Sequence, residues 1–246
     1  MLFFNCVSLQ SVAIPATLTT LGENVFGDCI SLQTFAVENG NTAFSVENAV
    51  LMNAGKTTLF CYPPAKTETT YTVPNTITEI APYAFASAAD LTDVTLPTGL
   101  QTIGAWAFSQ TKLTSITIPN TVTTIGSYAF CNAASLKQVQ LPNSLQELQA
   151  AAFWGCSSLE QVTLPNTLQE IPIYAFYGCT GLQKLTVPSS VQTIASEAFQ
   201  GMFQKSPLPA IRILMQKPIS RKSFQAITPK DGNPAIPCKL WKHRPF

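Results

Sequence analysis

The sequence predicts a β-rich α/β solenoid built from repeats of about 22–23 residues. Phenylalanine recurs at an almost constant interval, and from Phe85 onward every step has the same length except the one before Phe130, which is one residue shorter. The seven copies are Phe26, Phe85, Phe108, Phe130, Phe153, Phe176 and Phe199. Proline keeps the same interval, and 46% of the residues are apolar while only 11% are charged. Such a period is typical of a solenoid, in which each repeat buries its apolar face by stacking on the next.

One repeat, residues 136–153 with the sequence LKQVQLPNSLQELQAAAF, shows the expected course of a coil. The side chains predicted to point inward are Leu136, Val139, Leu141, Leu145, Leu148, Ala152 and Phe153. Pro142 is expected to end the first strand, because proline has no N–H for a strand ladder. Phe153 fills a wide space, and burying such a side chain stabilises a fold by about 1.5–3 kcal/mol. The repeat therefore predicts a stacked apolar core.

Residues 1–200 are predicted to form the solenoid, with a hairpin-type insert at about residues 38–72. The interval from Phe26 to Phe85 is more than twice as long as the later ones, which leaves room for this insert. Its segment FSVENAVLMNAGKTTLFCYP has two extended apolar runs around Ala54-Gly55-Lys56, a pattern typical of a β-hairpin. The opening MLFFNCVSLQ matches the middle of a repeat, with Phe4 as a partial copy of the recurring phenylalanine. We therefore expect the chain to begin inside the solenoid.

Charge is distributed unevenly along the chain. Residues 1–200 carry five lysines and twelve acidic residues, whereas residues 201–246 carry nine basic residues and one acidic residue. The basic residues are spread among prolines and apolar segments rather than forming a run, so a solvated segment is favoured over nucleic-acid binding. No stretch approaches the roughly 18 apolar residues that span a bilayer, so no membrane insertion is expected. The opening lacks a basic start and a long apolar region, so no signal peptide is expected.

The residue types that catalysis or metal binding needs are scarce. The single histidine, His243, lies near the end of the chain, far from any candidate nucleophile in the repeats. Asp90 and Asp93 are expected at a turn and at a solvent-facing strand position. The sequence has no Gly-rich phosphate loop and no C-x-x-C pair. We therefore predict no catalytic, cofactor-binding or metal-binding residues, no cofactor, and a protein that is not an enzyme.

Cysteines recur at one place in the repeat. Cys29, Cys156 and Cys179 each lie three residues after a phenylalanine and three before a leucine, and Cys6 keeps the same spacing to Leu9. In other repeats this place is expected to hold Ala88, Gln110 and Ala133. Because adjacent coils lie about 4.8 Å apart, Cys156 and Cys179 fall within the range for a disulfide. A buried thiol in a small space is favoured, and the disulfide stays open as the alternative.

Large aromatic residues also lie beside the phenylalanine series. They are Tyr83, Trp106, Tyr128, Trp154, Tyr174 and Tyr177. They could form a binding strip, but at about one per coil they are favoured to pack over the convex side.

The repeat resembles that of the BspA-type leucine-rich repeat family, C-x-x-L-x-x-[VI]-x-[IL]-P-x-x-[LVI]-x-x-I-x-x-x-A-F, over about residues 3–200. The insert resembles the family's N-x-x-F-S-V-x-x-x-V-L module through Asn41, Phe44, Ser45, Val46, Val50 and Leu51. The resemblance implies a right-handed coil with short parallel strands on its concave face. It also implies that residues 201–246 are a basic, cap-like segment, truncated or diverged at its KHRPF end, with a strand in the run IRILM.

Members of this family are typically exported surface proteins of bacteria or protozoa that bind host matrix proteins or other cells. The resemblance therefore implies an extracellular or cell-surface location and a role in adhesion. Within the repeat, the outward positions of each first strand define the candidate binding face. They are Asp93, Thr95, Ser115, Thr117, Gln138, Gln140, Gln161, Thr163, Lys184 and Thr186.

This Thr- and Gln-rich face offers many weak hydrogen-bonding sites and suits an extended protein or glycan ligand. We therefore predict a non-enzymatic binding module. The alternative is a structural spacer, one segment of a longer surface solenoid, in which threonine serves only β propensity and solubility.

Overall fold

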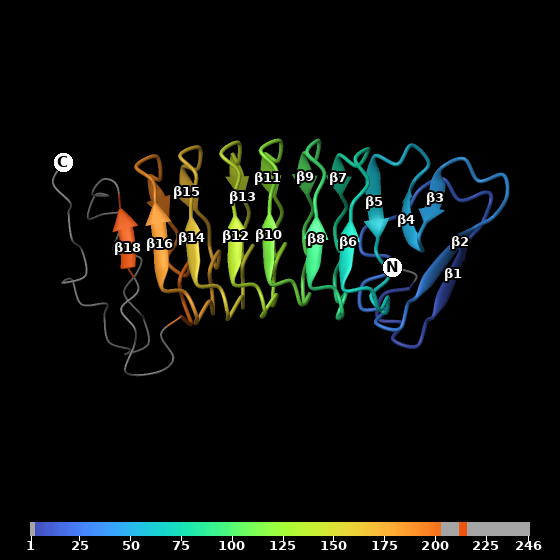
Figure 1. The fold of residues 1–246 in the computed structure, drawn as a ribbon, viewed down its shortest axis with the longest axis horizontal. Helices are drawn as coiled ribbons and strands as arrows, with labels where there is room; N and C mark the ends of the chain where they lie inside the picture. The colour runs from blue at the N-terminus through green and yellow to red at the C-terminus, as the bar shows by residue number, and fades with distance from the viewer. Residues whose placement is uncertain (1–2, 203–211, 216–246) are drawn as a thin grey trace.

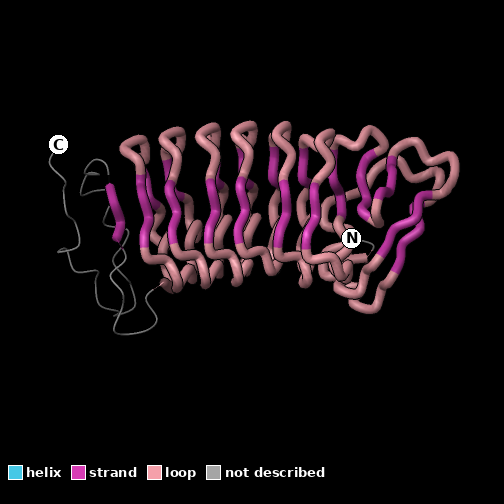
Figure 2. Tube along the Cα trace, viewed as in Figure 1, coloured by secondary structure: helices cyan, strands magenta, loops and turns pink. Residues whose placement is uncertain are grey.

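The computed structural model describes residues 3–202 and 212–215. The chain winds into coils that stack side by side along the long axis of the molecule (Figure 1). From β6 (Thr70–Thr72) to β17 (Thr193–Ile194), each coil has two short strands joined by tight turns (Figure 2). No helix occurs among the described residues, so the α/β part of the predicted class is wrong there and the fold is a β-solenoid.

The turns that replace helices have a local cause. In the segment APYAFASAAD, the backbone is left-handed at Tyr83 (φ 62°) and Ser87 (φ 60°). A helix cannot continue through such residues, and the segment is too short to form a stable helix by itself. The same left-handed conformation recurs two residues before the phenylalanine in later coils, at Trp106, Tyr128, Ala151 and Tyr174.

The first strand of each coil lies in a row of parallel strands that we call the front row. Its members are β1 (Ser11–Ile14), β2 (Thr34–Val37), β6 (Thr70–Thr72), β8 (Asp93–Thr95), β10 (Ser115–Thr117), β12 (Gln138–Gln140), β14 (Gln161–Thr163), β16 (Lys184–Val187) and β18 (Arg212–Met215). Hydrogen bonding divides the row into the sheets β1-β2, β6-β8 and β10-β12-β14-β16-β18. The break between β8 and β10 falls in the coil that is one residue shorter than the others. Residues 203–211 and 216–246, including His243, lie outside the described residues.

The second strands form a back row. Its members are β7 (Glu79–Ile80), β9 (Thr102–Ile103), β11 (Thr124–Ile125), β13 (Glu147–Leu148), β15 (Glu170–Ile171) and β17 (Thr193–Ile194). The row is continuous from β7 to β13, whereas β15 and β17 form a separate pair. Gln149 N donates to Ile125 O at 3.0 Å, and Ala195 N donates to Ile171 O at 2.9 Å. Pro172 occupies the same place in the intervening coil and has no N–H to donate, which removes one bond between β13 and β15.

The insert adds three antiparallel strands, β3 (Phe44–Glu47), β4 (Val50–Asn53) and β5 (Thr58–Cys61). The predicted hairpin around Ala54–Lys56 corresponds to β4 and β5. A second tight turn at Asn48 (φ 50°) and Ala49 (φ 67°) adds β3. Since β5 also pairs in parallel with β7, it continues the back row.

The core follows the predicted repeat. All seven inward residues of the coil 136–153 are buried. From Phe85 to Phe199 the phenylalanines form one continuous stack, with ring centroids 4.9 to 5.9 Å apart and ring planes within 10° of parallel. Tyr62, which lies one repeat length before Phe85 in the chain, extends this stack at 5.4 Å. The sequence prediction missed Tyr62 because it looked only for phenylalanine.

The first repeat was assigned one residue too late. Phe3, not Phe4, stacks on Phe26, with ring centroids 5.9 Å apart and ring planes 12° apart. Phe4 is 43% exposed. Phe3 also lies three residues before Cys6, the spacing found in the other coils, so the cysteine spacing was the signal that identifies it.

Candidate functional site

The ten residues of the predicted binding face lie on five neighbouring front-row strands, β8 to β16. In each strand the central residue is buried and the flanking residues point outward, as the alternation of a half-buried strand requires. Thr186 is half-buried and the other nine side chains are exposed. The prediction of which residues share one face therefore agrees with the structure, while the binding role of that face stays a prediction.

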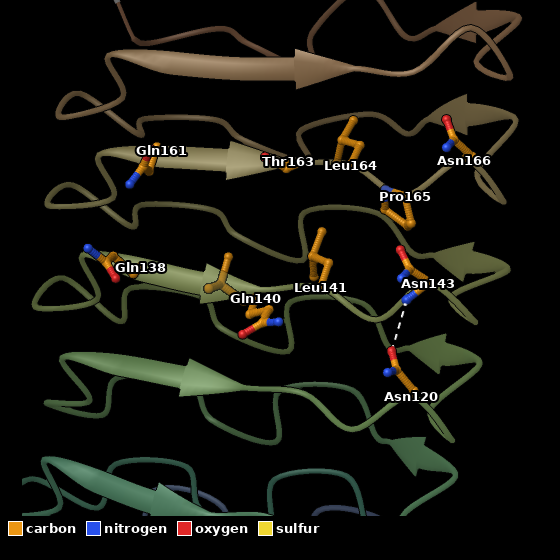
Figure 3. A pocket seen from close by; sticks show the side chains of 11 residues that line it. Asn120, Gln138, Gln140, Leu141, Asn143, Gln161, Thr163, Leu164, Pro165 and Asn166 are labelled. Atoms are coloured by element: carbon orange, nitrogen blue, oxygen red, sulfur yellow. Dashed lines mark hydrogen bonds between the residues drawn. The ribbon is translucent and has the colours of Figure 1, made fainter.

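A groove of about 530 Å³ crosses this face between β12 and β14 (Figure 3). Its polar lining comes from four strand residues, Gln138, Gln140, Gln161 and Thr163. Three asparagines outside the strands, Asn120, Asn143 and Asn166, also line it. The residues that complete its lining are Val139, Leu141, Leu164 and Pro165. We call this feature the amide groove, because six of its seven polar side chains are carboxamides. The other six residues of the predicted face lie outside it.

The amide groove lies where the front row opens. β12 and β14 pair at a single position, Gln138 with Gln161, whereas β10–β12 and β14–β16 pair at three positions each. Ile118 N donates to Gln140 O at 3.2 Å, and Leu164 N donates to Thr186 O at 3.0 Å. Within the described part of the chain, no such bond joins Leu141 N to Thr163 O. The ladder between the two strands is therefore incomplete at their carboxyl ends.

The three asparagines of the groove follow the strand-ending prolines at the interval of the repeat, in the motifs Pro119-Asn120, Pro142-Asn143 and Pro165-Asn166. Their side chains lie on successive coils (Figure 3), and Asn143 N donates to Asn120 Oδ1 at 3.2 Å. Sequence reasoning missed them because it considered only positions inside the strands. The repeated Pro-Asn dipeptide was the available signal.

No charged side chain lines the amide groove. The charged residues of the predicted face are Asp93 and Lys184, which lie on β8 and β16, the outermost of the five strands. An uncharged site bounded in this way offers hydrogen-bond donors and acceptors rather than ionic contacts.

The aromatic residues beside the phenylalanine stack form a second stack. Tyr83 and Trp106 lie 5.9 Å apart with planes 4° apart, and Trp106 and Tyr128 lie 4.3 Å apart with planes 9° apart. Trp154 and Tyr177 form a further stacked pair at 4.0 Å, since Trp154 is tilted by 41° from Tyr128. Because the ring faces cover one another, they are not free to stack on a ligand. The structure therefore favours the packing interpretation over a binding strip.

The cysteines in the described residues are all free thiols. Cys156 Sγ donates to Phe130 O and Cys179 Sγ donates to Phe153 O, each at 3.1 Å and each across to the preceding coil. Burial raises the pKa of Cys179 to about 12 and that of Cys156 well above its ordinary value. Such thiols are poor nucleophiles at neutral pH. Both therefore pack as buried hydrogen-bond donors.

In one coil, the wrong residue was predicted at the repeat position that cysteine occupies in other coils. Gln110 is exposed. Thr111 is buried at this position instead, and its Oγ1 donates a hydrogen bond to Phe108 O at 2.9 Å. In this coil Leu113 follows its phenylalanine one residue sooner than the matching leucine does elsewhere, so the two spacings used in the prediction disagree there. The buried side chain is the one that follows the phenylalanine by three.

The residues with described positions contain no group of three His, Cys, Asp or Glu side chains arranged to hold a metal ion. They also form no helix with the length and apolar character needed to cross a bilayer.

The stacked coils, the inward leucines and the phenylalanine series define a leucine-rich repeat solenoid. The family model described as "BspA type Leucine rich repeat region" matches six copies, over residues 1–58, 56–157 and 106–227. The chain belongs to this family. No protein with a curated description matches the sequence significantly.

Solved structures support the assignment. A leucine-rich repeat protein from Eubacterium ventriosum is 31% identical, with a TM-score of 0.66 over 83% of this chain and 62% of its own. A leucine-rich cell surface protein from Faecalibacterium prausnitzii is 27% identical, with a TM-score of 0.62 over 90% of this chain and 51% of its own. The pneumococcal vaccine antigen PcpA, 20% identical with a TM-score of 0.59 over 89% of this chain and 53% of its own, shares the fold. The chain thus spans about half to three fifths of the length of these proteins.

Proposed function

We propose that this chain is a non-enzymatic binding module of a cell-surface protein, and that it binds an extended protein or glycan through the front face of β8 to β16. The observation that carries the proposal is the amide groove, a hollow in an exposed face whose lining side chains offer both donors and acceptors. The cell-surface location rests on the description of the Faecalibacterium prausnitzii relative. As part of the proposal we take the coil to be right-handed, as parallel crossovers almost always are, with the front row on its concave side.

The composition of the face also sets the strength of binding that we expect. Trp, Tyr and Arg, which dominate tight protein interfaces, are absent from the ten residues of the face. Individual contacts should therefore be weak, and useful affinity should come from an extended ligand that touches several coils at once.

The alternative function is a structural spacer that displays other parts of a longer surface protein. The observation in its favour is that the solved relatives are longer than the region this chain matches. A spacer needs no groove, so it predicts that changes on the front face leave ligand capture unaffected.

Capture by the immobilised chain separates the two functions. The probes are purified extracellular-matrix proteins and purified polysaccharides. The test variant is Gln138→Glu, Gln140→Glu, Gln161→Glu, and the matched control is Gln146→Glu, Gln169→Glu, Gln192→Glu, which adds the same charge at exposed positions outside the groove. Loss of capture in the test variant alone is expected for a binding module. Equal capture by all three proteins, or none by any, contradicts it.

A further inference from the structure

The open position between β12 and β14 leaves backbone groups of two groove-lining residues, Leu141 and Thr163, without their ladder bond. Leu141 N and Thr163 O would form the next hydrogen bond of the ladder, as Leu164 N and Thr186 O do in the following pair. Leu141 is only 9% exposed, and within residues 3–202 its N–H has no hydrogen-bond partner. A backbone N–H without a protein partner needs another group to accept its hydrogen bond, so this position favours a ligand atom that can do so.

A hydroxyl group suits this open position. It both donates and accepts, so one hydroxyl can accept from Leu141 N and donate to Thr163 O. A carboxylate or phosphate could accept from Leu141 N but would face the Thr163 carbonyl oxygen with an unfavourable negative charge. The carboxamides of Gln138, Gln140 and Gln161, which likewise donate and accept, line the same groove, and Gln140 lies nearest to Leu141 (Figure 3).

We infer that the amide groove binds a neutral, hydroxyl-rich chain, a polysaccharide, with one sugar hydroxyl bridging Leu141 N and Thr163 O. This inference rests on the proposed binding function and names its ligand class. Charge supports it, because no lining residue is ionisable and an ionic ligand would find no counter-charge.

An extended peptide fits this groove less well. Its side chains repeat about every 6.6–6.8 Å, whereas neighbouring strands lie about 4.7–4.9 Å apart, so a peptide crossing the strands loses register from coil to coil. A peptide running along the strands could not add to the sheet, because β12 and β14 already lie between β10 and β16. A protein ligand is therefore the competing outcome of the test rather than the proposal.

NMR of the ¹⁵N-labelled chain tests the inference at the residue concerned. The probes are cellohexaose and mannohexaose, a heparin hexasaccharide, and a Ser/Gly-rich hexapeptide. Without ligand, the Leu141 amide is expected to exchange with solvent faster than the bonded amides of Ile118 and Leu164. A neutral hexasaccharide should shift the Leu141 resonance, slow its exchange and bind equally well at low and high salt.

The variants from the capture experiment complete the test. The Gln138→Glu, Gln140→Glu, Gln161→Glu protein should bind the hexasaccharide at least tenfold more weakly, whereas the Gln146→Glu, Gln169→Glu, Gln192→Glu control should bind as the wild type does. Binding of the peptide or of matrix proteins that depends on the groove, without any neutral saccharide binding, overturns the polysaccharide inference and leaves the binding module standing. Salt-sensitive binding of heparin alone also overturns it. No groove-dependent binding of any probe contradicts both proposals.

Discussion

The rings of Phe130 and Phe153 lie parallel, with centroids 5.2 Å apart and planes 4° apart, although a whole repeat separates them in the chain. Both side chains are fully buried, and each also stacks on a second phenylalanine, in the coil on its other side. The stack therefore joins each coil to both neighbours, which is the contact on which a solenoid depends for stability.

Replacing Phe130 by alanine should destabilise the protein strongly. The change removes a fully buried ring from the middle of the stack, and Phe→Ala in a core typically costs about 3–5 kcal/mol. Thermal unfolding followed by circular dichroism measures the effect. Phe4→Ala is the control, since Phe4 is 43% exposed, and it should change the melting temperature little. Equal melting temperatures for the two variants would contradict the stacked-core assignment.

Gly126 should tolerate no side chain. A Cβ atom there would lie 2.5 Å from the backbone N of Ala105 in the preceding coil, so the two coils would have to move apart. Such overpacking costs about 1–3 kcal/mol, and Gly126→Ala should lower the midpoint of urea unfolding. At Gly99, where a Cβ atom would meet nothing within 4 Å, the same substitution should leave the midpoint unchanged or raise it slightly. The reverse order of stability would refute the close approach at Gly126.

The cysteines should all react as free thiols once the chain is unfolded. Iodoacetamide in denaturant without reductant is expected to add seven groups, because the sequence has seven cysteines and the described ones are free. Intact mass spectrometry counts them. Before denaturation, Cys156 and Cys179 should label slowly because they are fully buried. A product with only five groups would show a disulfide and overturn the thiol assignment.

Alkaline pH should weaken the fold through the same thiols. The pKa of Cys179 is raised by burial from 9.0 to about 12, so the folded state holds this proton more tightly than the unfolded state. Its contribution is complete below pH 9 and is lost as the pH rises from 9 toward 12, at about 1.4 kcal/mol per pH unit. The free energy of unfolding, measured in urea at pH 8, 9.5 and 10.5, checks this.

Cys179→Ala provides the comparison for the pH series, since Ala88 and Ala133 occupy the matching buried position in other coils. The variant should be less stable than the wild type at pH 8 and should lose less stability above pH 9. Parallel curves for the two proteins would show that Cys179 does not titrate in this way.

The variant Trp106→Ala tests whether the aromatic stack or the front face binds the ligand. The Trp106 ring lies between Tyr83 and Tyr128, and aromatic pairs contribute about 0.5–1.5 kcal/mol each beyond burial. Trp106→Ala should therefore lower the melting temperature while ligand capture at a temperature well below the transition is unchanged. Loss of capture by a folded Trp106→Ala protein would assign binding to the aromatic stack instead.

The repeat, the inward residues and the outward face could be predicted because each depends on a side-chain pattern with a fixed period. Val139, Leu141 and Phe153 are buried for the reason that the sequence suggests, namely that every coil places the same residue type at the same point. The placement of Phe3 and Thr111 was missed because two spacings pointed to different residues. In both cases the contact seen in the structure identifies the residue that occupies the repeat position.

The amide groove could not be predicted in the same way. It depends on the separation of β12 from β14, and neither QVQ nor QVT differs from its neighbours in a manner that indicates fewer hydrogen bonds. The break at Pro172 was readable in principle, because a proline at the place of a donating residue removes one bond. Its effect on a whole strand pair became visible only in the structure.

The same two coils are thus poorly joined on both rows. In front, β12 and β14 share one paired position, and behind them β13 and β15 do not pair. The turn side connects them instead, where Ala151 N, Phe153 N and Gly155 N each donate to the next coil, together with the contact of Phe153 with Phe176 and the continuous apolar core. In a solenoid each coil is stabilised mainly by its nearest neighbours, so this junction depends on the turn side and the core more than the others do. A ligand in the amide groove would touch both coils and would add contacts across the front of this junction.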